Sequence, residues 1–543
     1  MSVPHLHDEL ARNPQRVKVA TKFGDIVGGR ANNGIDVLML SIVCAEVPYA
    51  LPPKRFEDPV PLPSNFRYPA KEYIEESTYG AQPLNDGQAA GTPFVDKVGY
   101  GKPSENPLFL NIVAPPSFPE KRNFPVKVYI HGGFLQFGSP HGISGQAQFI
   151  SAERSEVWVN IGYRLSVFGF LASDKPNLSG NYGFKDQWTA LEWIKNNIEA
   201  FGGDPNNIEL SGLSAGAHSV HQLLHHASRL PEGYKAPFQT VILESNAILA
   251  DPKTQAELRP QFEALCNALD LDPNSPDTLD TLKDPKKVSW KSITHVIETE
   301  KLGKYGTFRG CLGDDGWLSP KKPGSPVPES LMEWQRTGGF AHSLRARGVK
   351  AVVLGDLKEE WYLYSIAHPI NGPADILPNL ERYFSDYLSQ KLIDAYPPLK
   401  ENASKEEATR RYGDILSAAQ VHLPARLLVR DLRAAGFPVV RYEIRWTPEQ
   451  NRPLGYVTHG CDRVLWALRE PSLQGDQRDI AIAWLNRVYE ELDTARSVGS
   501  NYRRPLTSVL TLKENKTIDW AEDARWDEMM ELNAAVGEFK SKL

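Results

Sequence analysis

Short apolar runs that alternate with helical patterns constrain the fold of this chain more than any other feature. From about residue 125, candidate strands follow one another at 126–131, 156–161, 208–212, 239–244, 350–355 and 438–444. Each run is almost continuously apolar, as expected of strands that are covered on both faces. Residues 184–201 carry apolar residues at helical spacing and end at two glycines. The alternation predicts an α/β fold with a mostly parallel central sheet and helices on both faces.

Two intervals between these strands, 245–349 and 356–437, are much longer than ordinary connections. Both contain helix-like patterns. We therefore expect large helical insertions over one end of the sheet, where they would form a substrate pocket. A further apolar stretch, 37–45, predicts a buried strand nearer the start of the chain.

Charge and cysteine content exclude some classes of function. The net charge of -6 over 543 residues argues against a nucleic-acid partner, because binding phosphates needs a basic patch. No run of 18 apolar residues predicts a membrane span, and the start of the chain lacks the pattern of a secretory signal. The cysteines are sparse and form no CxxC pair; they are Cys44, Cys266, Cys311 and Cys461. Free thiols and a cytoplasmic location are the expectation.

The sequence Gly212-Leu213-Ser214-Ala215-Gly216 is the strongest chemical motif. A G-x-S-x-G sequence that follows a strand and precedes a helix is typical of a sharp turn that presents the serine hydroxyl as a nucleophile. Here the strand pattern of 208–212 precedes the motif, and a helical pattern follows it. The context therefore favours a nucleophilic serine over an ordinary glycine-rich turn.

Several segments resemble the type-B carboxylesterase/lipase family, which includes cholinesterases and fungal lipases. They are SENPLFLNIVAP (104–115), YRLSVFGFL (163–171) and GNYGFKDQWTALEWIKNNIEAFGGDPNNIELSGLSAGA (180–217). The resemblance implies one α/β-hydrolase domain over residues 1–543, with no cofactor and no metal. The family's usual disulfide looks absent, since Pro107 and Gln82 stand at its cysteine positions.

In the α/β-hydrolase fold, the order of catalytic residues along the chain is serine, acid, histidine. By resemblance to the family's motifs, the acid is Glu360, with Glu359 as the runner-up and Asp356 behind it. The base is His459, in a segment similar to the family's HG-x-D/E motif. The resemblance thus implies a triad of Ser214, Glu360 and His459.

Backbone N–H groups must also stabilise the oxyanion that forms during acyl transfer. The residue after the nucleophile, Ala215, supplies one donor. The resemblance assigns the others to Gly133 and Phe134, in the loop after strand 126–131. Phe134 replaces a family glycine, and its ring adds bulk beside the acyl pocket.

Three histidines and one leucine near the serine also bear on function. His218, His221 and His225 share one face of a predicted helix, but without a thiol or carboxylate at ligand spacing we favour packing over metal binding. Leu213 replaces a family glutamate next to the serine, which disfavours cationic substrates. A small, neutral, hydrophobic ester is the expected substrate.

These residues predict a serine carboxylic-ester hydrolase that works through an acyl-enzyme intermediate. Hydrolysis of an amide, lactone or carbamate with the same triad stays open, because the acyl chemistry is shared. A third possibility is a non-catalytic binding member of the family. The sequence leaves the oligomeric state open.

Overall fold

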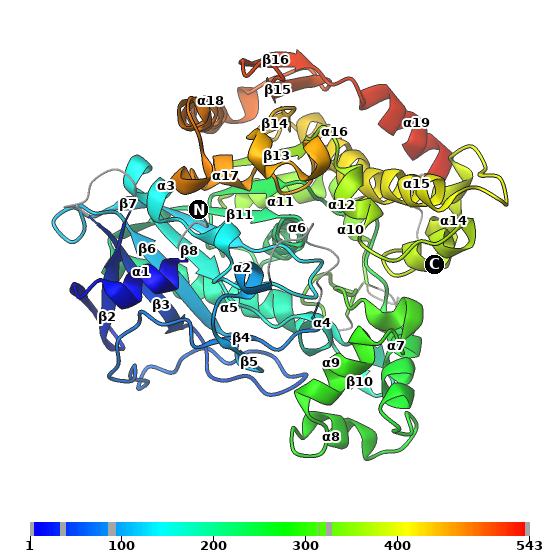
Figure 1. Cartoon of the computed structure of the whole chain (residues 1–543), viewed down its shortest axis with the longest axis horizontal. Coiled ribbons are helices and arrows are strands. Elements are labelled where there is room, and N and C mark those ends of the chain that lie inside the picture. The colour runs from blue at the N-terminus through cyan, green and yellow to red at the C-terminus, as the bar shows by residue number, and fades with distance from the viewer. Residues whose placement is uncertain (1–4, 33–39, 85–93, 314, 322–327, 538–543) are drawn as a thin grey trace.

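The computed structural model describes residues 5–32, 40–84, 94–313, 315–321 and 328–537. Its centre is a 12-stranded sheet that extends across the molecule (Figure 1). In spatial order the strands are β1 (Arg16–Thr21), β2 (Gly24–Ala31), β3 (Ser41–Pro48), β6 (Phe109–Ala114), β8 (Val157–Ile161), β7 (Phe124–Ile130), β11 (Gly203–Leu213), β12 (Thr240–Glu244), β13 (Ala351–Leu357), β14 (Val439–Ile444), β15 (Ser508–Leu512) and β16 (Ile518–Glu522). Two short pairs lie outside it: β4 (Thr78–Gly80) with β5 (Lys102–Ser104), and β9 (Ser173–Asp174) with β10 (Asn177–Leu178).

The middle of the sheet is parallel and its ends are antiparallel. All neighbours from β8 to β15 pair in parallel. The strands β1, β2, β3, β6 and β16 pair antiparallel with their neighbours. The six strands expected from the sequence are β7, β8, β11, β12, β13 and β14, so the predicted α/β class is confirmed. The predicted strand 37–45 corresponds to β3, although residues 37–39 lie outside the described residues.

Alternate residues of the parallel strands pack into two cores, one on each face of the sheet. On β12, Val241 and Leu243 belong to the first core and Ile242 to the second. The first core is covered by α5 (Tyr182–Asn197), α6 (Ala215–Ser228), α11 (Gly339–Ala346) and α16 (Leu423–Ala434). The second is covered by α3 (Gln148–Arg154), α17 (Arg463–Trp466) and α18 (Gln477–Val498). Covering both faces explains why these strands are apolar at nearly every position.

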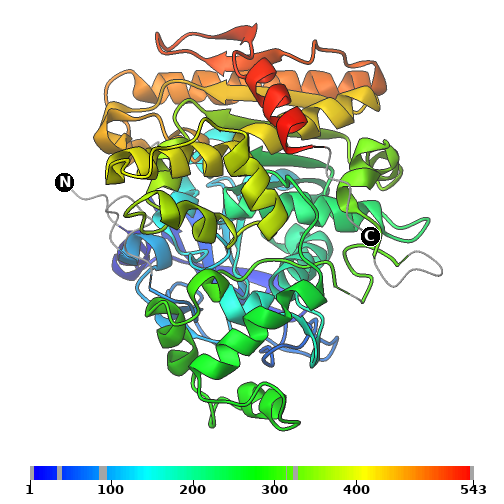
Figure 2. The same cartoon turned by 90° about the vertical axis from the view of Figure 1, so that its right-hand side faces the viewer.

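The two long intervals are helical, as expected. Between β12 and β13 lie α7 (Gln255–Ala268), α8 (Thr278–Lys283), α9 (Trp290–Glu298), α10 (Leu331–Arg336) and α11. Between β13 and β14 lie α12 (Trp361–Ser365), α13 (Ile376–Leu380), α14 (Asp386–Asp394), α15 (Lys405–Ser417) and α16. Both views place α7–α9 at the end of the molecule opposite β15 and β16 (Figure 1, Figure 2). The remaining helices are α1 (Leu6–Arg12), α2 (Phe94–Val98), α4 (Ser166–Phe170) and α19 (Trp526–Val536).

Strand register brings distant segments together at one edge of the sheet. Leu213 at the end of β11 pairs with Glu244, which pairs with Gly355, which pairs with Tyr442. The carboxyl ends of β11, β12, β13 and β14 therefore lie in a row. Loops that leave this edge of a parallel sheet are the usual place for a ligand site.

Two further findings concern expectations from the sequence. Within the described ranges, no helix is long and apolar enough to cross a membrane. All four cysteines are buried, and none forms a disulfide within the described residues. Since the sheet takes strands from both ends of the chain, we propose that the chain forms one domain.

Candidate active site

Ser214 occupies a strained turn between β11 and α6. Its backbone has φ 61° and ψ −122°, a combination that costs an ordinary residue about 1–3 kcal/mol. The turn is held by hydrogen bonds on both sides: the N–H of Ser214 donates to the carbonyl of Glu244 (2.8 Å), and its carbonyl accepts from the N–H of His218 (2.9 Å). Strain that the surrounding structure maintains in this way is typical of a functional position.

The two glycines of the motif permit the turn. A Cβ atom on Gly216 would lie 2.0 Å from the carbonyl oxygen of Ile130, and one on Gly212 would lie 2.4 Å from the carbonyl carbon of Gly216. Neither contact is possible for a side chain, so α6 can approach β7 and β11 this closely only through glycine. The sequence motif thus reflects close packing of backbone on backbone.

The predicted base and the first-choice acid are in direct contact. Nδ1 of His459 donates to Oε2 of Glu360 at 2.6 Å. The other carboxylate oxygen of Glu360 accepts from the N–H of Leu357 at 3.0 Å. Glu360 is fully buried at the start of α12, and His459 is buried in the loop after β14. Burial and two donors fix the carboxylate, which in turn fixes the orientation of the imidazole.

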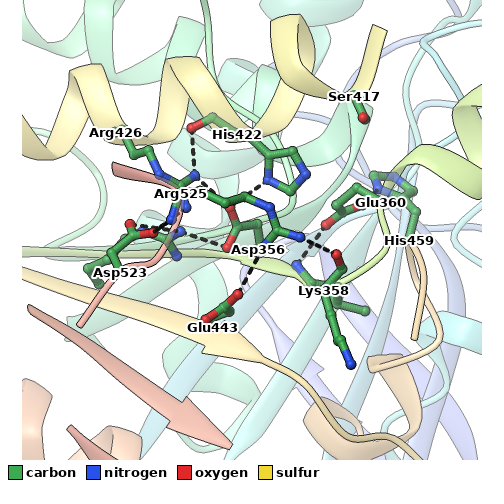
Figure 3. A network of polar contacts seen from close by, with 12 residues as sticks. Asp356, Lys358, Glu360, Ser417, His422, Arg426, Glu443, His459, Asp523 and Arg525 are labelled. Atoms are coloured by element: carbon green, nitrogen blue, oxygen red, sulfur yellow. Dashed lines mark hydrogen bonds and ion pairs between the residues drawn. The ribbon is translucent and has the colours of Figure 1, made fainter. Parts of the chain in front are cut away.

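The two alternative acids have other partners. Oε2 of Glu359 accepts from the N–H of Val457 (2.6 Å), two residues before His459. Asp356 is bound by Arg441 (2.6 Å), Arg426 (2.9 Å) and Nδ1 of His422 (2.9 Å). Figure 3 shows Glu360 beside His459, whereas Asp356 lies toward His422 and Arg426.

These contacts give the three carboxylates different tasks. Glu359 holds the loop that carries His459, and Asp356 neutralises buried arginines. Arg441 and Arg426 keep the pKa of Asp356 well below its usual range, although burial alone would raise that pKa. Only Glu360 contacts the predicted base.

The loop of His459 lies against the turn of Ser214. A Cβ atom on Gly460 would be 3.5 Å from Cδ2 of Leu213, so the residues that follow His459 and precede Ser214 touch. Nε2 of His459 is buried and has no hydrogen-bond partner among the described residues. The structure therefore joins acid and base by a hydrogen bond and leaves the second imidazole nitrogen free. In free enzymes, catalytic hydrogen bonds often form only when substrate binds.

The loop after β7 provides the predicted oxyanion donors. Gly133 has φ 114°, and a Cβ there would lie 2.0 Å from the carbonyl oxygen of Phe137, so only glycine fits. Phe134 follows with φ 56°. Among the described residues, the backbone N–H groups of Gly133, Phe134 and Ala215 have no hydrogen-bond acceptor. A Cβ on the neighbouring Gly132 would lie 3.0 Å from Cβ of Ser214, so this loop adjoins the nucleophile.

Two glutamines hold this loop in place. Gln82 accepts from the N–H of Gly138 (2.7 Å) and donates to its carbonyl (3.0 Å). Gln136 donates to the carbonyls of Phe134 (2.8 Å) and Phe308 (2.6 Å). Gln82, which the sequence analysis placed at a cysteine position of the resembled family, thus holds the loop after β7 by hydrogen bonds.

Aromatic side chains from the second insertion pack around the site. The ring of Tyr364 lies 5.1 Å from the ring of His459 and 6.0 Å from that of Phe134. The ring of Tyr383 lies 6.0 Å from Phe134. A cleft of about 480 Å³ is lined by Phe134, Gln136 and Tyr383. A larger cavity, about 740 Å³, lies between α9 and a set of residues that includes Tyr79, Phe94 and Pro103, and none of the predicted site residues lines it.

The histidines of α6 have structural partners. His221 accepts from the N–H of Ile248 (3.0 Å) and contacts Gln335 (2.9 Å). The ring of His225 stacks on His221, with centroids 5.0 Å apart. Within the part of the chain that the structure describes, no group of three His, Cys, Asp or Glu side chains could hold a metal ion.

Three side chains near the site were missed by the sequence analysis: Tyr364, Tyr383 and Arg309. All three come from the insertions, whose sequences carry no motif. A fourth, Asp462, lies in the segment that resembles the HG-x-D/E motif and is fully buried. Burial, followed by the charges of Glu244 and Glu360, raises the pKa of Asp462 to about 8.

Comparisons with known proteins agree with this arrangement. A model of the carboxylesterase family matches residues 15–481. A carboxylic ester hydrolase of Gibberella moniliformis is 31% identical over 511 residues, 89% of each chain. The para-nitrobenzyl esterase of Bacillus subtilis is 28% identical over 385 residues, 70% of each chain.

A solved structure of a PNB esterase superimposes with a TM-score of 0.70 at 23% identity, covering 96% of this chain and all of that one. The α/β-hydrolase fold is therefore confirmed, as is the expected family, and with it an enzyme that acts on carboxylic esters. The chain belongs to the carboxylesterase family.

Proposed function

We propose that this enzyme hydrolyses carboxylic esters through a covalent acyl-enzyme on Ser214, with His459 as general base and Glu360 as the acid that orients it. The observation that carries the proposal is the 2.6 Å hydrogen bond from Nδ1 of His459 to Glu360, in a loop that touches the Ser214 turn. A serine hydroxyl attacks an ester only when a base removes its proton, and the free Nε2 of His459 is available for this task.

The reaction has two stages. Ser214 Oγ attacks the ester carbonyl while His459 takes the hydroxyl proton, and the same imidazole then gives that proton to the departing alcohol. A water molecule next attacks the acyl-enzyme with His459 again as base, which releases the acid and restores the serine. Glu360 stays ionised and stabilises the imidazolium that forms in each stage.

Negative charge that develops on the carbonyl oxygen is met by backbone donors. The proposed donors are the N–H groups of Gly133, Phe134 and Ala215, which have no acceptor within the described residues. Each such donor is worth about 3 kcal/mol of transition-state stabilisation in comparable enzymes. Because Gln136 and Gln82 already hold the loop, no reorganisation is needed when the charge appears.

Apolar groups next to the scissile bond fit the surroundings of the proposed site. The rings of Tyr364 and Tyr383 contact the ring of Phe134 in the loop after β7, and the ring of Tyr364 also contacts His459. Leu213 places no charge beside the nucleophile, so a choline-type cation gains no attraction there. The same catalytic groups could attack the carbonyl of an amide, lactone or carbamate, and these are the alternative substrates.

The test is hydrolysis of 4-nitrophenyl butyrate by the wild type and by Ser214→Ala. We expect the variant to lose nearly all of the rate while keeping the wild-type melting temperature. A variant that hydrolyses the ester as fast as the wild type would show that another residue is the nucleophile. No hydrolysis by the folded wild type, with a panel of esters of graded size, would favour a non-catalytic binding role.

A reducing location is a further proposal. Four buried cysteines that form no disulfide within the described residues support it. Fractionation of the source cells, followed by detection of the protein in each fraction, tests it.

A further inference from the structure

Arg309 contacts the helix that begins after the proposed nucleophile. Its Nη2 is 3.4 Å from Nδ1 of His218, in the first turn of α6. The N–H of His218 donates to the carbonyl of Ser214 (2.9 Å). Arg309 therefore contacts the side chain of a residue that lies one helical turn after the serine.

Further contacts connect Arg309 with the loop after β7 and with the aromatic rings near the site. Phe308, which precedes it, exchanges two hydrogen bonds with the side chain of Gln136. The guanidinium of Arg309 lies 5.3 Å from the centre of the Tyr383 ring, which packs against Phe134. The guanidinium thus lies against an aromatic ring that packs on Phe134, and its backbone neighbour is tied to the loop after β7.

No carboxylate among the described residues forms an ion pair with Arg309. Its close neighbours are uncharged: burial and the charge of Arg309 hold the pKa of His218 well below its usual value, so that imidazole is neutral. Several other arginines of the interior pair with carboxylates, as Arg164 does with Asp186 and Arg441 with Asp356. Arg469 is an exception, and it donates to the carbonyl of Ile143 and to the side chain of Gln146. A partly buried guanidinium without an anion is costly, and burial lowers the pKa of Arg309.

Arg309 also keeps part of its surface accessible, since it is only half-buried. A cation that is surrounded by neutral groups and still reachable is suited to an anion that arrives from outside. A guanidinium and a carboxylate form two parallel hydrogen bonds, and this geometry is specific to planar anions.

We propose that Arg309 binds a carboxylate of the substrate, so that the preferred substrate is an ester that also carries a free carboxylate, as a half-ester of a dicarboxylic acid does. This inference rests on the proposed function of Ser214. It refines the expectation of a neutral substrate: the part next to the scissile bond is apolar, and the far end is anionic. The carboxylate belongs either to the acyl part or to the alcohol part.

The reaction itself is unchanged by this contact. Water adds across the bond between acyl carbon and alcohol oxygen, and the remote carboxylate keeps its charge throughout. Its contact with Arg309 is the same in the ground state and the transition state. Such uniform binding lowers KM and leaves kcat nearly constant.

The experiment compares matched esters. For the acyl part the pair is mono(4-nitrophenyl) adipate and methyl 4-nitrophenyl adipate. For the alcohol part the pair is 4-carboxyphenyl hexanoate and 4-(methoxycarbonyl)phenyl hexanoate. Within each pair the carboxylate is replaced by its methyl ester, which removes the negative charge. Differences in intrinsic reactivity are the same for every enzyme variant, so the change in the ratio of kcat/KM (anionic ester over neutral ester) between wild type and variant isolates the contribution of the residue that was replaced.

We expect this ratio to favour the anionic ester in one of the two pairs. In Arg309→Gln the ratio should fall by at least about tenfold, mainly through KM, as expected on losing a hydrogen bond between two charged groups. Arg309→Lys should recover part of it. The control is Arg478→Gln: Arg478 lies on α18, outside the cleft, and pairs with Glu153 (2.8 Å), so its loss should leave the ratio unchanged.

Two results separate failure of this inference from failure of the proposed function. If the wild type hydrolyses both members of each pair, Ser214→Ala does not, and Arg309→Gln leaves every ratio unchanged, the inference is wrong and the function stands. If Ser214→Ala hydrolyses the esters as well as the wild type, the proposed function itself is wrong.

Discussion

Replacing Glu360 by glutamine tests the assignment of the acid, because three carboxylates lie within five residues. Glutamine keeps the size of the side chain and removes its charge. In the proposed mechanism the imidazolium of His459 forms beside the carboxylate, with a nitrogen–oxygen distance of 2.6 Å and about 4 Å between the charge centres. At an effective dielectric constant of about 20, that pair is worth about 4 kcal/mol. We expect kcat to fall by about a thousandfold.

Stability should respond differently. Glu360→Gln removes a buried charge and retains an acceptor for the N–H of Leu357, so the melting temperature should stay within a few degrees. Glu359→Gln is the matched control, because its amide oxygen can still accept from Val457; kcat should stay within about threefold of the wild type.

Asp356→Asn should instead destabilise the fold. Among the described residues, only Asp523 would then remain as an ion-pair partner of Arg426 and Arg441, and breaking such buried pairs costs about 3–5 kcal/mol. The assay is 4-nitrophenyl butyrate hydrolysis together with thermal and urea unfolding for all three variants. Full activity in Glu360→Gln, or a folded but inactive Asp356→Asn, would refute the assignment of Glu360.

Three further predictions concern the loop after β7 and the pH dependence. Gly133→Ala should abolish ester hydrolysis, because its Cβ would meet the carbonyl oxygen of Phe137, whereas Gly233→Ala, also at positive φ but in open space, should keep the rate. Phe134→Gly should raise kcat/KM for branched acyl esters relative to butyrate and lower stability by about 3 kcal/mol, measured by kinetics and urea unfolding. The raised pKa of Asp462 means that the folded state binds a proton which the unfolded state releases near pH 4. Stability from this group is complete below pH 4 and is lost as pH rises to about 8, by up to about 1.4 kcal/mol per pH unit. Urea unfolding of Asp462→Asn at pH 5.5 and 7.5 should therefore show a smaller loss with pH than the wild type, and an equal loss would contradict the shift.

Prediction from sequence succeeded where packing restricts the residue types that can stand at a position. Gly212 and Gly216 are required by contacts between main-chain atoms, so the motif around Ser214 could be recognised. The parallel strands were found because burial on both faces makes them apolar throughout. The strands β1, β2, β6, β15 and β16 were not predicted. The antiparallel strands β1, β2 and β16 are only partly buried and carry a weaker signal. The strands β6 and β15 are buried at almost every position and were missed all the same.

Within the candidate site, what escaped prediction depends on tertiary contacts. The sequence offered Glu359, Glu360 and Asp356 as acids, and only the three-dimensional arrangement gives each a different partner. Arg309 carries no motif, and its lack of a carboxylate partner is a property of the folded chain. Long insertions are poorly constrained by periodicity, so the residues they contribute to a pocket must be read from the structure.

The central claim is that Ser214 becomes acylated. The direct measurement is mass spectrometry of the enzyme quenched with acid during turnover of 4-nitrophenyl butyrate, followed by peptide mapping. The account predicts a butyryl group on the peptide that contains Ser214, and no such group in Ser214→Ala. A butyryl group on another residue, or steady turnover without any acylated peptide under conditions that trap intermediates, would contradict it.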